Sequence, residues 1–134
     1  MRHIIRILLI AVCVAAQAMA QQVTQPRTIT AVIASGASVS TLVVLGGCTP
    51  AAILMPSAWT AANVGIQATV DNATYYDVFD QYGSKLGIVA AASRWIVLTP
   101  SDTWSFFSLR LTSIDSAGTA VNQAAARTMT VVCR

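Results

Sequence analysis

The chain has 134 residues, of which 55% are hydrophobic and 10% are charged, and its formal net charge is +3. A basic excess this small, with no run of basic residues, argues against nucleic acid as a partner. The single histidine is His3, and the sequence contains no glutamate. Residues after position 20 therefore lack the base of a Ser-His-Asp or Cys-His centre and the commonest transition-metal ligand, so we expect a non-enzymatic protein without a cofactor or a bound metal.

Residues 1–20 have the pattern of a secretory signal peptide. A basic start with Arg2 and His3 is followed by an apolar run and by Ala-Met-Ala at 18–20, which supplies small residues at the cleavage positions. The apolar part is about a dozen residues long, short of the roughly 20 that span a membrane. The alternative is that residues 1–20 are retained as an apolar, helical N-terminal arm. Residues 21–134 keep six basic and five acidic side chains, a net charge of +1, and we expect them to form one domain.

Short strands separated by turn residues are predicted along the rest of the chain. The first half gives strands at 27–34, 41–47 and 51–55, with Gly-Gly or proline at their ends. Residues 57–63 are too short for an independent helix, and we expect one helical turn or a bend there, with Ser57 as the N-cap.

The clearest pattern is a hairpin that begins at residue 64. Val64, Ile66, Ala68 and Val70 alternate with other residues, a turn with Asp and Asn follows at 71–73, and a second, aromatic strand follows the turn. Further strands are predicted at 86–91, 94–98, 106–112 and 127–133. Eight or nine short strands of this composition predict an all-β fold, an antiparallel β-sandwich of jelly-roll type.

The segment VNQAAAR (121–127) could be a short helix by propensity, but its position between two strands favours a crossing loop. We expect Asn122 and Gln123 to satisfy backbone groups in that crossing and Arg127 to begin the last strand. Cys48 and Cys133 form an even pair after residue 20, and in an exported protein they would form a disulfide. The alternative is two small buried apolar side chains.

The sequence offers residues for two kinds of ligand site. Asp71, Asp77 and Asp80 lie near one another around the hairpin and could bind calcium, although aspartate is also a common turn residue. Aromatic side chains could stack on sugar rings, and the candidates are Trp104, Trp59, Tyr75 and Tyr76. Trp95, inside a predicted strand, is expected in the core.

Two stretches, LGGCTPAAILMPSAWTAANVGIQATVDNATYYDVFDQYGSKLGI (45–88) and LRLTSIDSAGTAVNQAAARTMTVV (109–132), resemble a group of small structural proteins of tailed phages and prophages. The resemblance extends from Thr28 to Val132. The family's motif positions are occupied here by Pro56, Trp59, Asp71, Tyr76, Gly83, Arg110, Ser113, Gly118, Val121, Asn122, Gln123 and Arg127. Where the family has RSGT, this chain has LTSIDSAGT (111–119), so the loop before the Asn-Gln segment differs. The hairpin also looks like that of discoidin-like, galactose-binding jelly rolls.

The resemblance implies a non-enzymatic β-sandwich in a phage or phage-derived particle, as a decoration, minor capsid or tail- or fibre-associated protein. Its partners would be other subunits of the particle, and it would form a homo-oligomer. The alternative is an exported module that binds a surface glycan. The expected location is accordingly the virion or, if residues 1–20 are a signal peptide, the periplasm or the exterior.

Overall fold

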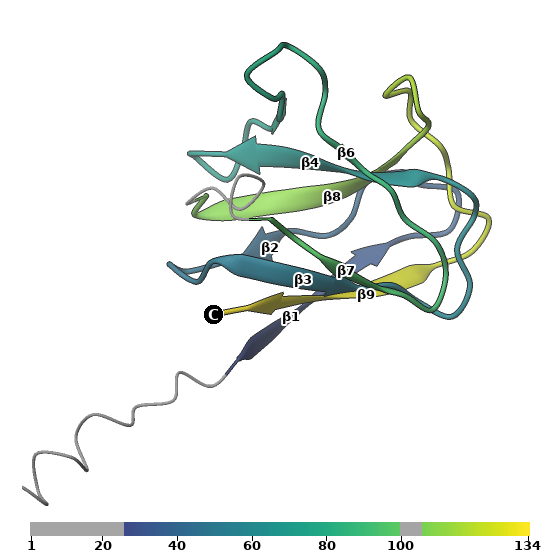
Figure 1. Cartoon of the computed structure of the whole chain (residues 1–134), viewed down its shortest axis with the longest axis horizontal. Coiled ribbons are helices and arrows are strands. Elements are labelled where there is room, and N and C mark those ends of the chain that lie inside the picture. Colours follow the sequence, from purple (N-terminus) through teal and green to yellow (C-terminus); the bar gives the residue numbers. More distant parts are fainter. Residues whose placement is uncertain (1–25, 100–105) are drawn as a thin grey trace, which may run out of the picture.

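The computed structural model describes residues 26–99 and 106–134 of the chain as two antiparallel sheets packed face to face (Figure 1). The four-stranded sheet has the order β1 (Arg27–Ile33), β9 (Arg127–Cys133), β3 (Pro50–Leu54), β7 (Trp95–Val97). The five-stranded sheet has the order β2 (Val43–Val44), β8 (Ser108–Ile114), β4 (Asn63–Thr69), β5 (Tyr76–Asp77), and β6 (Gly87–Ile88) pairs with β4 beside β5. Among the described residues, no helix is long and apolar enough to cross a membrane.

Strand pairing is nested in the manner of a jelly roll. The first strand pairs with the last, β2 pairs with β8, β3 pairs with β7, and β4 pairs with β5 and β6. This is the pattern of one long antiparallel ribbon wrapped into two sheets. The predicted all-β, jelly-roll sandwich is therefore confirmed.

The core lies between the two sheets and is built by the period-two alternation of the strands. The four-stranded sheet contributes buried side chains that include Ala31, Ile33, Ile53, Met129 and Val131. The five-stranded sheet faces them with Val43, Val64, Ile66, Leu109 and Leu111. Burial of these apolar side chains is the main favourable contribution to folding.

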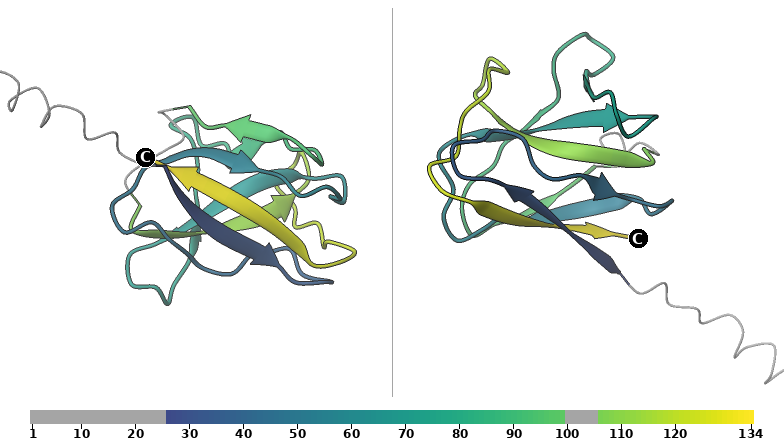
Figure 2. Two further views of the ribbon diagram at one scale, coloured as in Figure 1. Left: turned by 90° about the horizontal axis from the view of Figure 1, so that it is seen from below. Right: turned by 180° about the vertical axis from the view of Figure 1, so that it is seen from behind.

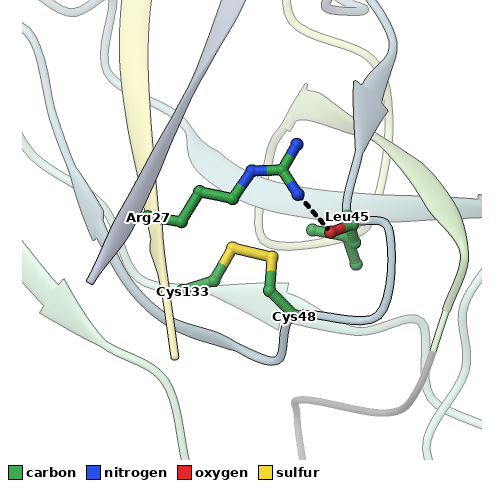
Figure 3. Close-up of a disulfide and its surroundings, with 4 residues drawn as sticks. All are labelled: Arg27, Leu45, Cys48 and Cys133. Carbon is green, nitrogen blue, oxygen red and sulfur yellow. Dashed lines mark hydrogen bonds between the residues drawn. A yellow bond between two sulfur atoms is a disulfide. The ribbon is translucent and has the colours of Figure 1, made fainter. Parts of the chain in front are cut away.

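The predicted disulfide is present. Cys48, in the turn before β3, is bonded to Cys133 at the end of β9, with the two Cα atoms 5.6 Å apart (Figure 3). Arg27 extends over the same corner, where its Nη1 donates a hydrogen bond of 3.1 Å to the carbonyl of Leu45. The disulfide thus joins the end of the last strand to the connection that crosses from one sheet to the other.

Several local predictions were wrong. The strand expected at 41–47 is confined to Val43–Val44, because Gly46 and Gly47 take positive φ values of 58° and 88° and turn the chain. The alternating run was expected to continue to Val70, but β4 ends at Thr69 and Val70 is fully exposed. Residues 57–63 contain bends at Ser57 and Ala61, so of the two expected alternatives the bend is confirmed and the helical turn with Ser57 as its N-cap is wrong.

Trp95 was expected in the core and is instead 60% exposed. Its cross-strand partner is Leu54, whereas the adjacent pair is Ile96 and the buried Ile53. Cross-strand partners share a face, so Ile96 points inward and Trp95 points outward. Either face of β7 carries an apolar side chain that could pack in the core, and the pairing with β3 turns the face with Ile96 inward.

Candidate interaction surface

No outward-facing position of the described strands β1, β3, β7 and β9 carries a charged side chain, and the exposed Arg134 follows directly after β9. We call the surface that these positions form the outer sheet face; the register of the strands places on it Thr28, Thr30, Val32, Ala52, Leu54, Trp95, Val97, Thr128, Thr130 and Val132. The sheet's two charged residues, Arg27 and Arg127, stand opposite the buried Cys133 and Ile33 and therefore have the other parity. Figure 2 (left) shows this sheet from outside, with the green strand β7 at its edge.

The most exposed apolar side chains of the outer sheet face belong to β7. Trp95 is 60% exposed and Val97 is 79% exposed. A tryptophan side chain with this much solvent exposure in a folded monomer is typical of a surface that binds a partner molecule.

The far edge of β7 presents free backbone groups. The carbonyl of Arg94 accepts a hydrogen bond of 2.8 Å from Met55, and the N–H of Leu98 donates one of 2.9 Å to Ala51. Hydrogen bonding alternates along an antiparallel ladder, so the N–H and C=O groups of Trp95 and Val97 point away from β3. Within the part of the chain that the structure describes, no strand pairs with that edge.

The opposite edge of the same sheet is covered at one end. Along β1, the N–H of Thr41 donates a hydrogen bond of 2.8 Å to the carbonyl of Val32, and the Oγ1 of Thr41 accepts one of 3.1 Å from the N–H of Val32. Arg27 reaches across to Leu45 a few residues away. The segment 40–45 therefore covers the β1 edge at Val32, whereas no described residue pairs with the free edge of β7.

The outward side of the five-stranded sheet has a different character, because polar side chains and loops cover it. The Nζ of Lys85 lies 2.8 Å from Oδ2 of Asp77 and donates a hydrogen bond of 3.2 Å to the carbonyl of Gly118. The Nε2 of Gln67 donates one of 3.0 Å to Oδ1 of Asp77. Partial burial alone would raise the pKa of Asp77, but the hydrogen bonds from Lys85 and Gln67 and the charge of Lys85 outweigh it and lower the pKa.

The aspartates proposed as calcium ligands serve local structure. The Oδ1 of Asp71 accepts hydrogen bonds from the backbone N–H groups of Thr74 (2.8 Å) and Ala73 (2.9 Å) and from the hydroxyl of Thr69 (2.9 Å), and these bonds lower the pKa of Asp71. Asp80 accepts bonds from backbone N–H groups in the next turn. Among the described residues no group of three His, Cys, Asp or Glu side chains could hold a metal ion.

A similar loop follows β8. The Oδ1 of Asp115 accepts 2.8 Å hydrogen bonds from the backbone N–H groups of Thr119 and Ala117, and the bond from Thr119 is the main reason that the pKa of Asp115 is lowered. A pocket of about 380 Å³ opens beside this loop, lined by Asn63, Ser84, Lys85, Gly87 and residues 114–118. Of the aromatic candidates for sugar stacking that the structure describes, Trp59, Tyr75 and Tyr76, none lines it.

The three stacking candidates that the structure describes do not form one platform. Trp59 packs against the core, and its Nε1 donates a hydrogen bond of 2.9 Å to the carbonyl of Ala62. The ring of Tyr75 is covered by the guanidinium of Arg110, whose Cζ is 3.6 Å from the ring centroid. Tyr76 is 68% exposed, and Trp104 lies outside the described residues. The exposed aromatic rings that were not among the candidates are Phe79, Tyr82, Trp95 and Phe107.

The Asn-Gln segment is a loop between β8 and β9, as predicted, and Arg127 begins β9. The two amides behave differently. Asn122 is exposed, whereas Gln123 is completely buried and its Oε1 accepts a hydrogen bond of 2.9 Å from the backbone N–H of Thr60. The Nε2 of Gln123 donates one of 2.7 Å to the hydroxyl of Ser113. Gln123 therefore joins two connections between the sheets.

Comparison of this chain with protein-family models, with curated proteins and with solved structures finds no match.

Proposed function

We propose that this protein is a non-enzymatic structural component of a phage or phage-derived particle, as a decoration, minor capsid or tail- or fibre-associated subunit, and that it acts through protein–protein contacts. The observation that carries the proposal is the charge-free outer sheet face, which ends at the open edge of β7. Desolvation of a charge is costly, so a surface without charges can be covered by a partner at little electrostatic cost. The centres of protein interfaces are depleted of charged residues and enriched in tryptophan, as this face is around Trp95.

The resemblance of the Asn-Gln segment and its surroundings to phage structural proteins supplies the kind of assembly. The jelly-roll topology is compatible with this role and does not by itself favour it over others, since one fold serves many functions.

Purified particles test the proposal. The strain that encodes the chain is induced to release phage, the particles are banded by density, and their proteins are identified by mass spectrometry. We expect peptides from residues 27–133 in the particle band at a fixed ratio to the major capsid protein. Recovery of the chain solely in the particle-free fraction would contradict the role.

An exported glycan-binding module is the second candidate. The observation in its favour is that Tyr76, Phe79 and Tyr82 are all exposed on one short stretch of chain. A glycan array with the wild type and with Tyr76→Ala, Tyr82→Ala and Trp104→Ala variants tests it. Binding that is lost in one of these variants and kept in a Val70→Ala control, which changes a fully exposed valine, would favour this candidate.

Export is a separate proposal, supported by the disulfide between Cys48 and Cys133, because structural disulfides persist in oxidising compartments. N-terminal sequencing of the protein isolated from its natural source tests it. A chain that starts at Gln21 supports a cleaved signal peptide, whereas a chain that starts at Met1 or Arg2 supports a retained N-terminal arm.

A further inference from the structure

We propose that β7 is a self-association edge, along which two copies of this chain join their four-stranded sheets into one continuous antiparallel sheet. This inference deepens the proposed function, since it names a second copy as the partner and β7 as the contact. It starts from the free N–H and C=O groups of Trp95 and Val97, which only another extended strand can pair in a regular ladder.

The register of the pairing follows from which groups are free. Ile96 uses its backbone groups toward β3, so it lies on the two-fold axis opposite Ile96 of the second copy. Trp95 of each copy then faces Val97 of the other. Each of these two equivalent pairs exchanges both of its backbone hydrogen bonds, as the hydrogen-bonded positions of an antiparallel ladder do.

Side chains fit the same arrangement. Trp95 and Val97 both stand on the outer sheet face, so each tryptophan lies beside a valine of the other copy, an aromatic and β-branched cross-strand pair. These two side chains are 60% and 79% exposed in the single chain and become covered in the pair.

Charge distribution favours a second copy as the occupant. The outer sheet face has no charged side chain, so two copies can be placed edge to edge without opposing like charges. The nearest charge, on Arg94, falls opposite the buried Leu98 of the other copy in this register rather than opposite another arginine. Natural sheets protect unused edges with lysine, proline or a covering loop. The β1 edge has such a cover at Val32, from residues 40–45, whereas no described residue covers the edge of β7.

The test compares Val97→Lys with Val89→Lys. Both valines are 79% exposed, so both variants add the same charge and remove the same exposed apolar side chain, but only Val97 lies in β7. Sedimentation equilibrium on the full chain across micromolar concentrations gives the dimer Kd. We expect a dimer for the wild type and for Val89→Lys, and a Kd raised at least about tenfold for Val97→Lys, because two lysines then stand at the joined edge.

Hydrogen exchange of the backbone amides gives a second readout that does not depend on a substitution. The amides of Trp95 and Val97 have no acceptor among the described residues, so we expect them to exchange quickly at low concentration and slowly at high concentration. A monomeric wild type at high concentration, a dimer equally weakened by Val89→Lys, or concentration-independent exchange of these amides would each overturn the inference.

The outcomes separate this inference from the proposed function. If the chain is found in particles but is monomeric, or if Val97→Lys does not weaken its dimer, the proposed function is supported and the β7 contact is contradicted. If Val97→Lys weakens the dimer but the chain is absent from particles, the β7 contact is supported and the proposed function is contradicted. Binding of β7 to a different protein of the particle, with no self-association, likewise overturns the choice of a second copy.

Discussion

The buried side-chain amide of Gln123 pairs with both backbone groups of Thr60, 63 residues earlier in the chain. Its Oε1 accepts a hydrogen bond of 2.9 Å from the N–H, and its Nε2 lies 3.4 Å from the carbonyl oxygen. The connection from β8 to β9 is thereby joined to the connection from β3 to β4. An amide side chain donates from its nitrogen and accepts at its oxygen, so it can pair with both groups of an isolated backbone unit.

Substitution of Gln123 by leucine should therefore be costly. The change keeps the approximate volume of the side chain but leaves the N–H of Thr60 and the hydroxyl of Ser113 without these partners, at about 2–4 kcal/mol in the free energy of unfolding. Urea denaturation measures it, with Asn122→Leu as the control, since Asn122 is exposed. A loss for Gln123→Leu no greater than that for Asn122→Leu would show that the buried amide contributes nothing.

Gly65 of β4 should not tolerate alanine. A Cβ at Gly65 would lie 2.5 Å from Oγ1 of Thr112 and 2.9 Å from Cδ1 of Ile114, so both side chains would have to move. We expect this to lower the free energy of unfolding by about 1–3 kcal/mol.

The matched control for Gly65→Ala is Gly87→Ala, because Gly87 is the cross-strand partner of Gly65 and a Cβ there would come no closer than 3.8 Å to another atom. Thermal unfolding of both variants should show a loss for Gly65→Ala alone. Adding Thr112→Ala to Gly65→Ala should restore part of it, because the substitution removes the clashing oxygen. Equal losses in the two glycine variants would contradict the steric explanation.

Removal of the disulfide by the double substitution Cys48→Ala/Cys133→Ala should lower the free energy of unfolding by about 2–5 kcal/mol, since the bond closes a long loop of the unfolded chain. A reducing agent should lower the unfolding temperature of the wild type and leave that of the double variant unchanged. If reduction changes neither protein, the two cysteines are not bridged in the purified material.

Stability should fall in acid, in part through Asp71. Backbone hydrogen bonds from Thr74 and Ala73 lower the pKa of Asp71 in the folded state, below the value near 3.9 of an unfolded aspartate. The contribution of the carboxylate is therefore complete above about pH 4 and is lost as the pH falls through the folded-state pKa. Unfolding temperatures between pH 5 and pH 2 should decline less steeply for Asp71→Asn than for the wild type; parallel curves would assign the acid sensitivity to other groups.

How well the sequence predicts each strand depends on how regularly apolar and polar residues alternate along it. Strands β1, β4 and β9 could be located almost to the residue, because long runs of period two leave one buried face and one choice of parity. β7 has apolar residues at every position, so its pattern did not decide whether Trp95 or Ile96 faces the core.

The sequence likewise could not predict which of the candidate binding residues are exposed. Trp59, Tyr75 and Tyr76 could be selected as aromatic residues, but residue type does not reveal that Arg110 covers Tyr75 or that Trp59 packs against the core. Nor could the sequence separate Asn122, which is exposed, from Gln123, which is buried, because the difference is set by the positions of Thr60 and Ser113.

The sequence by itself determined an all-β chain, its strand-rich segments and its paired cysteines, since alternation, turn residues and cysteine number are local properties. Only the tertiary structure decided that the outer sheet face is free of charge and that β7 is its open edge. Both depend on which strands lie side by side and in what register, and those are contacts between residues far apart in the sequence.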